Sequence, residues 1–85
     1  METKAVCKAF GNEERARLVA CLAREQSVGE LLDRCSLAQS ALSQHLRVLR
    51  DAGAIVARRE GKYVLYRART EAVRLAKLLL AYPHR

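Results

Sequence analysis

Three polar residues, Ser40, Ser43 and Gln44, stand at positions i, i+3 and i+4 of a segment with helical periodicity. This spacing places them on one face of a helix. A glutamine side chain can pair with adenine through two hydrogen bonds, and a serine hydroxyl can meet a donor or an acceptor on a base edge. Together with Gln39 at the start of the same segment, these side chains are suited to reading DNA bases in the major groove.

Basic residues accompany this polar row. Between positions 36 and 70 the sequence holds seven basic and two acidic residues, so this stretch carries +5 of the net charge of +7. Such a concentration of charge suits contact with DNA phosphates or with the minor groove. For His45 two roles stay open, DNA contact and support of the helix from beside the turn. The basic residues expected to contact DNA are Arg47, Arg50, Arg58, Arg59 and Lys62.

Helices must position these groups, and capping signals indicate where the helices begin. Asn12 suits the N-cap of a helix over about 13–24, and Ser27 with Glu30 forms a capping-box pattern before a short helix. The apolar face of the first of these helices comprises Ala16, Leu18, Val19, Cys21, Leu22 and Ala23. The segment 39–52 then predicts a helix whose inner stripe is Leu42, Leu46 and Leu49, and Gly53 ends it. That helix would carry the base-contacting row.

A hairpin and a final helix complete the expected elements. The segments 55–59 and 63–67 are rich in β-branched and aromatic residues, and a turn at 60–62 joins them into a wing over about 55–68. The last helix, about 70–82, is apolar on more than one face and includes Leu78, Leu79 and Leu80. It is interpreted either as one more core helix or, as we favour, as a dimerisation helix.

Length and composition limit the class of protein. With 85 residues and 51% hydrophobic residues, the chain is expected to form one domain over 1–85 rather than a disordered segment. It has neither an apolar run that could span a bilayer nor a signal-peptide core. Three cysteines do not suit a secreted disulfide framework, so we expect a cytoplasmic protein with reduced thiols. We expect no enzyme and no cofactor, because neither a phosphate-binding glycine loop nor a paired acid and base occurs.

The segments 27–31, 39–53 and 58–67 resemble the ArsR-type (arsenic-repressor-like) family of bacterial transcriptional regulators. The most specific part is the pattern S-x-H-L-x-x-L-R-x-A-G at 43–53, followed by the hairpin. The resemblance implies a mainly helical winged helix-turn-helix with a small β-hairpin, made of four helices, two strands and a fifth helix. It also implies a homodimer through the first and fifth helices. Such a dimer would act as a repressor on a short inverted-repeat operator in double-stranded DNA, and an effector would release it.

Several residues depart from the family pattern. Ala38 stands where a Ser or Thr cap is usual, so the helix at 39 either lacks a side-chain cap or is capped by Ser36. The Cys-x-Cys pair of the arsenic and cadmium branch is replaced by Ser27 and Gly29. The acid and histidine ligands of the zinc and nickel branches are also absent, because the last segment offers only Glu71 and His84. The resemblance therefore implies no metal site of these kinds.

The cysteines leave the effector open. Cys21 matches the cysteine of thiol-sensing relatives, but the second cysteine of those proteins is missing from 80–83. Cys7 is the candidate partner, and for both residues a sensing role and a plain packing role stay open. Cys35 is expected to pack like an aliphatic residue. A small thiol-reactive effector is the partner that this hypothesis requires, and thiolate binding of a metal by Cys7 and Cys21, with His84, is the weaker alternative.

Two other function classes are compatible with a winged helix. An architectural or non-specific DNA-binding protein without an effector would show weak, strongly salt-dependent binding with little sequence preference. A winged helix that binds only proteins is disfavoured by the polar Ser-Gln face and the local positive charge.

Overall fold

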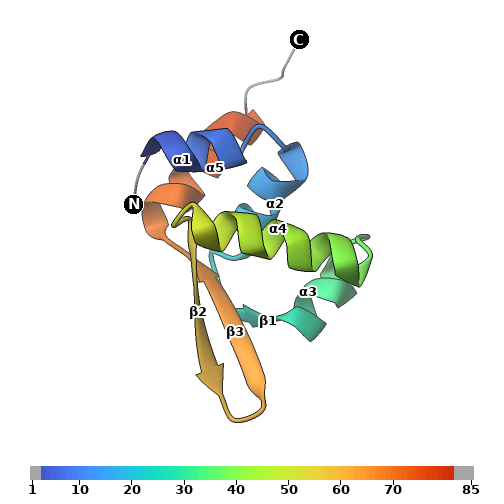
Figure 1. Ribbon diagram of the computed structural model, residues 1–85. Coiled ribbons are helices and arrows are strands. Elements are labelled where there is room, and N and C mark those ends of the chain that lie inside the picture. Colours follow the sequence, from blue (N-terminus) through green and yellow to red (C-terminus); the bar gives the residue numbers. More distant parts are fainter. Residues whose placement is uncertain (1–2, 82–85) are drawn as a thin grey trace.

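The computed structural model describes residues 3–81, which form five helices and three strands (Figure 1). The helices gather at one end, and the β2–β3 hairpin projects away from them (Figure 1). The predicted mainly helical fold with a small hairpin is confirmed. The elements in chain order are α1 (Thr3–Ala9), α2 (Glu13–Cys21), β1 (Gln26–Ser27), α3 (Val28–Arg34), α4 (Gln39–Asp51), β2 (Ile55–Glu60), β3 (Tyr63–Ala68) and α5 (Thr70–Ala81).

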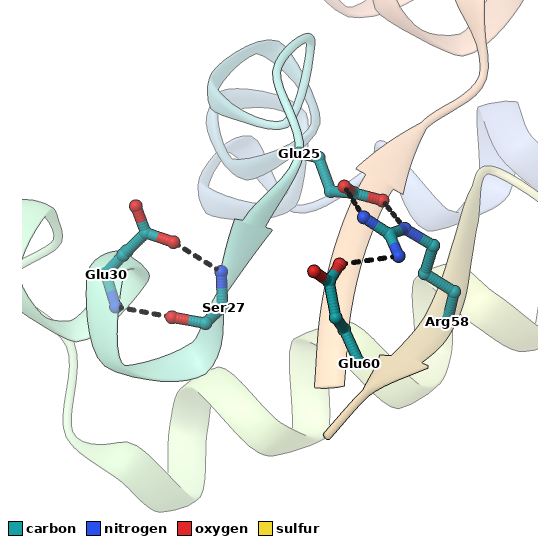
Figure 2. Close-up of polar contacts among 5 residues, drawn as sticks. All are labelled: Glu25, Ser27, Glu30, Arg58 and Glu60. Carbon is teal, nitrogen blue, oxygen red and sulfur yellow. Dashed lines mark hydrogen bonds and ion pairs between the residues drawn. The ribbon is translucent and has the colours of Figure 1, made fainter. Parts of the chain in front are cut away.

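Two of the three helix starts considered in the sequence have side-chain caps. The Asn12 side chain accepts hydrogen bonds from the backbone N–H groups of Glu14 and Arg15. The Ser27 hydroxyl accepts from the N–H of Glu30, whose carboxylate accepts from the N–H of Ser27 (Figure 2). Both predicted caps are confirmed. At the start of α4, by contrast, Ala38 has an extended backbone and no side chain caps the helix.

Helix α2 ends earlier than the sequence predicts, at Cys21 rather than at about 24. Two backbone carbonyls at this end of α2 accept hydrogen bonds from residues outside the helix. The carbonyl of Leu22 accepts a 2.8 Å hydrogen bond from the N–H of Ala68, and that of Cys21 accepts a 2.6 Å bond from Nε2 of Gln26. One of these bonds, from Ala68, joins α2 to the hairpin and favours the end of the helix at this point. The predicted apolar face of this helix also needs correction, because Cys21 and Ala23 are exposed.

The sheet has the strand order β1-β3-β2, with both pairs antiparallel. The hairpin pairs Ile55 with Ala68 at its base and Glu60 with Tyr63 at its tip, and Gly61 takes the positive φ that the turn requires. The short strand β1, which the sequence did not predict, pairs only Gln26 with Tyr66 and Ser27 with Leu65. Two residues are too few to show a strand pattern.

The core forms between the helices and the base of the hairpin. Leu42, Leu46 and Leu49 are buried, which confirms the predicted inner stripe of α4. Helix α5 packs against α2 and buries Ala72 and Ala76, but it leaves Leu78 and Leu80 exposed. Within the part of the chain that the structure describes, each helix is too short or too polar to cross a membrane.

Candidate nucleic-acid interface

The predicted base-contacting residues share the exposed side of α4. Gln39, Ser40, Ser43 and Gln44 are all exposed, while the leucine stripe of the same helix is buried in the core. Burial of the leucines fixes the rotation of α4, so the polar row must face outward. The structure thus brings these four residues together at the N-terminal end of one helix, where a helix-turn-helix meets base edges.

His45 lies at the boundary between this row and the core. The residue is half-buried, and its Nδ1 is buried without a hydrogen-bond partner among residues 3–81. One edge of the imidazole ring is therefore turned into the protein. This position favours the supporting role over direct base contact.

A groove runs beside the polar row. It has a volume of about 390 Å³, and its lining residues are Val28 of α3, Ser43, Leu46, Arg47, Arg50 and Asp51 of α4, and Tyr66 of β3. Both arginines are exposed. The groove places two predicted phosphate-contacting residues next to a predicted base-contacting serine, between α4 and the hairpin.

The hairpin gives its basic residues different surroundings. Arg58 donates from Nε and Nη2 to the two carboxylate oxygens of Glu25, at 2.6 and 2.7 Å, and its Nη1 lies 2.7 Å from Oε2 of Glu60 (Figure 2). The hydrogen bonds from Arg58 hold the pKa of Glu25 below its usual range, and the two carboxylates raise the pKa of Arg58. Arg58 thus braces the hairpin against the α2–β1 connection.

Arg59 and Lys62 remain exposed near the hairpin tip, and Nζ of Lys62 lies 5.5 Å from the centroid of the Tyr63 ring. Both residues are therefore accessible for the DNA contacts that the sequence predicts. Glu25 was not singled out in the sequence, because its partner is 33 residues away. No local pattern could have indicated that pairing.

The neighbour of Cys21 in the structure differs from the candidate partner, Cys7, that the sequence suggested. Cys7 and Cys21 are exposed, and Cys35 is half-buried. Cys21 shares a pocket between α2 and the α3–α4 connection with Cys35, not with Cys7. His84, considered above as a metal ligand, lies outside the described residues.

Comparisons with known proteins place these features in context. A family model described as a helix-turn-helix domain matches residues 10–58. The transcriptional activator HlyU of Vibrio cholerae is 45% identical over 74 residues, which cover 85% of this chain and 68% of that protein. The biofilm growth-associated repressor of Agrobacterium fabrum is 42% identical over 82 residues, covering 94% of this chain and 70% of the relative.

Solved structures agree with the sequence matches. The transcriptional repressor BigR from Xylella fastidiosa superposes with a TM-score of 0.81 at 33% identity, covering 96% of this chain and 87% of the other. The named functions of these relatives are those of transcription regulators, which confirms the expectation that the chain is not an enzyme.

Proposed function

The chain belongs to the ArsR-like family of winged helix-turn-helix transcription regulators, and from that premise we propose that it is a homodimeric repressor of a short inverted-repeat operator. In this proposal α4 is the recognition helix, the β2–β3 hairpin is the wing and α5 is the dimerisation helix. The observation that carries the proposal is the exposed polar row of α4 beside a groove lined by Arg47 and Arg50.

The proposed contacts divide into two kinds. Gln39, Ser40, Ser43 and Gln44 read base edges, because amide and hydroxyl groups can match the pattern of donors and acceptors in the major groove. Arg47, Arg50, Arg59 and Lys62 bind phosphates, which fixes the position of the protein on the duplex without reading its sequence. We assign Arg58 mainly to the support of the wing, because two carboxylates already engage its guanidinium.

The proposed dimer covers apolar surface that one chain leaves open. Leu78 is 55% exposed and Leu80 is 37% exposed. A hollow of about 420 Å³ beside them is lined by Phe10, Ala16 and Leu79, among others. A second copy packed on α1 and α5 would bury these leucines. Its twofold axis would set two recognition helices about 34 Å apart, the spacing of half-sites one helical turn apart.

The proposed mechanism is occlusion of a promoter, relieved when an effector shifts the dimer to a state that binds the operator more weakly. The exposed thiol of Cys21 supports a small thiol-reactive effector, since access is a requirement for thiol chemistry. Direction of control needs its own measurement, because the relatives named above include an activator and repressors.

The test is binding of the reduced protein to the DNA upstream of its own gene, compared with a scrambled duplex, over a series of salt concentrations. We expect selective binding of a twofold-symmetric site, with two chains per duplex in sedimentation. Equal affinity for both duplexes, with a steep salt dependence, would instead identify the architectural DNA-binding protein. A promoter-reporter assay then distinguishes repression from activation.

A further inference from the structure

Two cysteines that are far apart in the sequence line one pocket. The pocket has a volume of about 310 Å³ and lies where the end of α2 faces the α3–α4 connection, with Cys21 on one side and Cys35, Ser36 and Leu37 on the other. Burial raises the pKa of the Cys35 thiol, and the nearby Cys21 raises it further. Cys7 is not among the lining residues.

We propose that this pocket is a two-thiol modification site, at which a small organic disulfide oxidises Cys21 and Cys35 to an intramolecular disulfide. The exposed Cys21 reacts first, because a thiolate must reach the reagent. Its sulfur attacks the small disulfide RSSR, forms a mixed disulfide Cys21–S–S–R and releases one thiolate RS⁻. The role of Cys35 is to resolve this intermediate.

In the second step Cys35 loses its proton, attacks the Cys21 sulfur and displaces the second RS⁻. Two protein thiols are oxidised, and one small disulfide is reduced to two thiols. The two protons lost by the cysteines are taken up by the released thiolates. The half-buried position of Cys35 keeps it from reacting first with reagents in solution, and the pocket that it shares with Cys21 is where the mixed disulfide forms.

The position of Cys35 connects this chemistry to the base-contacting helix. Cys35 is the C-cap of α3, and only three residues separate it from the start of α4. A disulfide holds its two α-carbons within about 7 Å. The cross-link therefore fixes the α3–α4 connection against the end of α2. Since no side chain caps α4 at Ala38, this connection orients the start of the recognition helix together with the buried leucines of α4.

Cys21 connects the same chemistry to the wing. Its carbonyl accepts the 2.6 Å hydrogen bond from Gln26, and Gln26 pairs with Tyr66 of β3. The next carbonyl, that of Leu22, accepts from the N–H of Ala68 at the end of β3. A cross-link at the end of α2 thus acts on both parts of the proposed DNA interface. Its regulatory consequence rests on the proposed function, whereas its chemistry does not.

The first experiment treats the full chain with oxidised glutathione and maps its peptides by mass spectrometry without reduction. We expect a Cys21–Cys35 linked peptide in the wild type and in Cys7→Ser. In Cys35→Ala we expect glutathione to stay attached to Cys21, and circular dichroism checks that this variant folds. A Cys7–Cys21 link, a link between two chains, or unresolved glutathione on Cys21 of the wild type would overturn the proposal.

The second experiment measures DNA binding of the reduced and the cross-linked protein. We expect the cross-link to weaken operator binding roughly tenfold, and bound operator to slow formation of the cross-link, because coupling between two sites is reciprocal. Cys7→Ser should behave like the wild type. If the link forms but leaves selective DNA binding unchanged, its regulatory role is wrong and the proposed function stands. If the reduced protein binds no DNA selectively, the proposed function fails, and the regulatory role fails with it.

Discussion

The starts of α3 and α4 are held in opposite ways, although the two helices follow one another in the helix-turn-helix. At α3 the capping box of Ser27 and Glu30 satisfies backbone groups, and Ser27 also belongs to β1 of the sheet. At α4 the N-cap is Ala38, which offers no side-chain hydrogen bond. The helix that carries the proposed base-contacting residues is thus the less firmly anchored of the two. The difference indicates that α3 serves as a fixed support, while α4 depends on its preceding connection and on its buried leucines for orientation.

The largest expected effect is on the discrimination between DNA sequences by α4. Gln44→Ala should lose about 1–3 kcal/mol of discrimination at the base that Gln44 reads, because a two-point amide contact to that base is removed. Competition between operator duplexes with single base changes measures this loss. Equal weakening on every duplex would show that Gln44 does not read a base.

Two wing arginines provide the control for that measurement. Arg59→Ala should weaken binding to all duplexes evenly and reduce the slope of log affinity against log salt by about 1, as expected for a lost phosphate contact. Arg58→Ala should change the slope less, because Glu25 and Glu60 already balance its charge. A larger slope change for Arg58 than for Arg59 would reverse our assignment of these residues.

The start of α3 should show the next largest effect, on stability. Ser27→Ala removes the capping hydroxyl and should lower the free energy of unfolding by about 1 kcal/mol. Urea denaturation measures the change. Ser36→Ala, at an exposed serine in the α3–α4 connection, is the matched control and should stay within about 0.5 kcal/mol of the wild type. Similar losses of unfolding free energy in both variants would mean that the capping box stabilises the fold no more than an exposed serine does.

The start of α4 should respond in the opposite direction. Ala38 has the extended backbone that an N-cap requires, with φ −64° and ψ 149°. Ala38→Ser should therefore supply a cap and raise the free energy of unfolding by about 0.5–1 kcal/mol. Urea denaturation again gives the value. A loss of stability would show that the connection before α4 has no room for a capping side chain.

The smallest effect is the pH dependence of the stability that the Glu25–Arg58 ion pair contributes. Because Arg58 lowers the pKa of Glu25 in the folded protein, this pair stabilises the fold above the ordinary carboxyl pKa, and the contribution is lost as pH falls through the lowered value. Glu25→Gln should be slightly less stable than the wild type at neutral pH, and the two proteins should converge in acid. Both groups are exposed, so high salt should also reduce the difference. A difference that persists in acid would assign the effect to something other than the ion pair.

The sequence predicted those features that depend on neighbouring residues. Asn12, Ser27 and Gly53 each act within one helical turn, so their types alone indicated where helices begin and end. The leucine stripe of α4 repeats at helical spacing, and burial of that stripe was enough to predict which residues face outward.

The features that the sequence did not predict all join distant segments. Strand β1 exists because β3 offers it hydrogen-bond partners, and the pairing of Glu25 with Arg58 depends on the same meeting of segments. For Cys21, position on a helix predicted a place in the apolar face, but α2 ends at that residue and leaves it exposed. Its neighbour in space, Cys35, could be found only after α2 and α3 had been placed.

The short pairing of β1 has a mechanical consequence for the hairpin. Strand β1 supports β3 only at Leu65 and Tyr66, so the outer residues through Gly61 extend beyond this support as a lever (Figure 1). At about 3.3 Å per residue, the tip stands about 13 Å from Leu65, the outer of the two supported residues. A rotation of about 10° at Leu65 would then move the tip by about 2 Å, more than half the length of one residue along a strand. In the proposed complex with DNA, small adjustments where α2 meets the sheet would therefore shift Arg59 and Lys62 relative to the duplex.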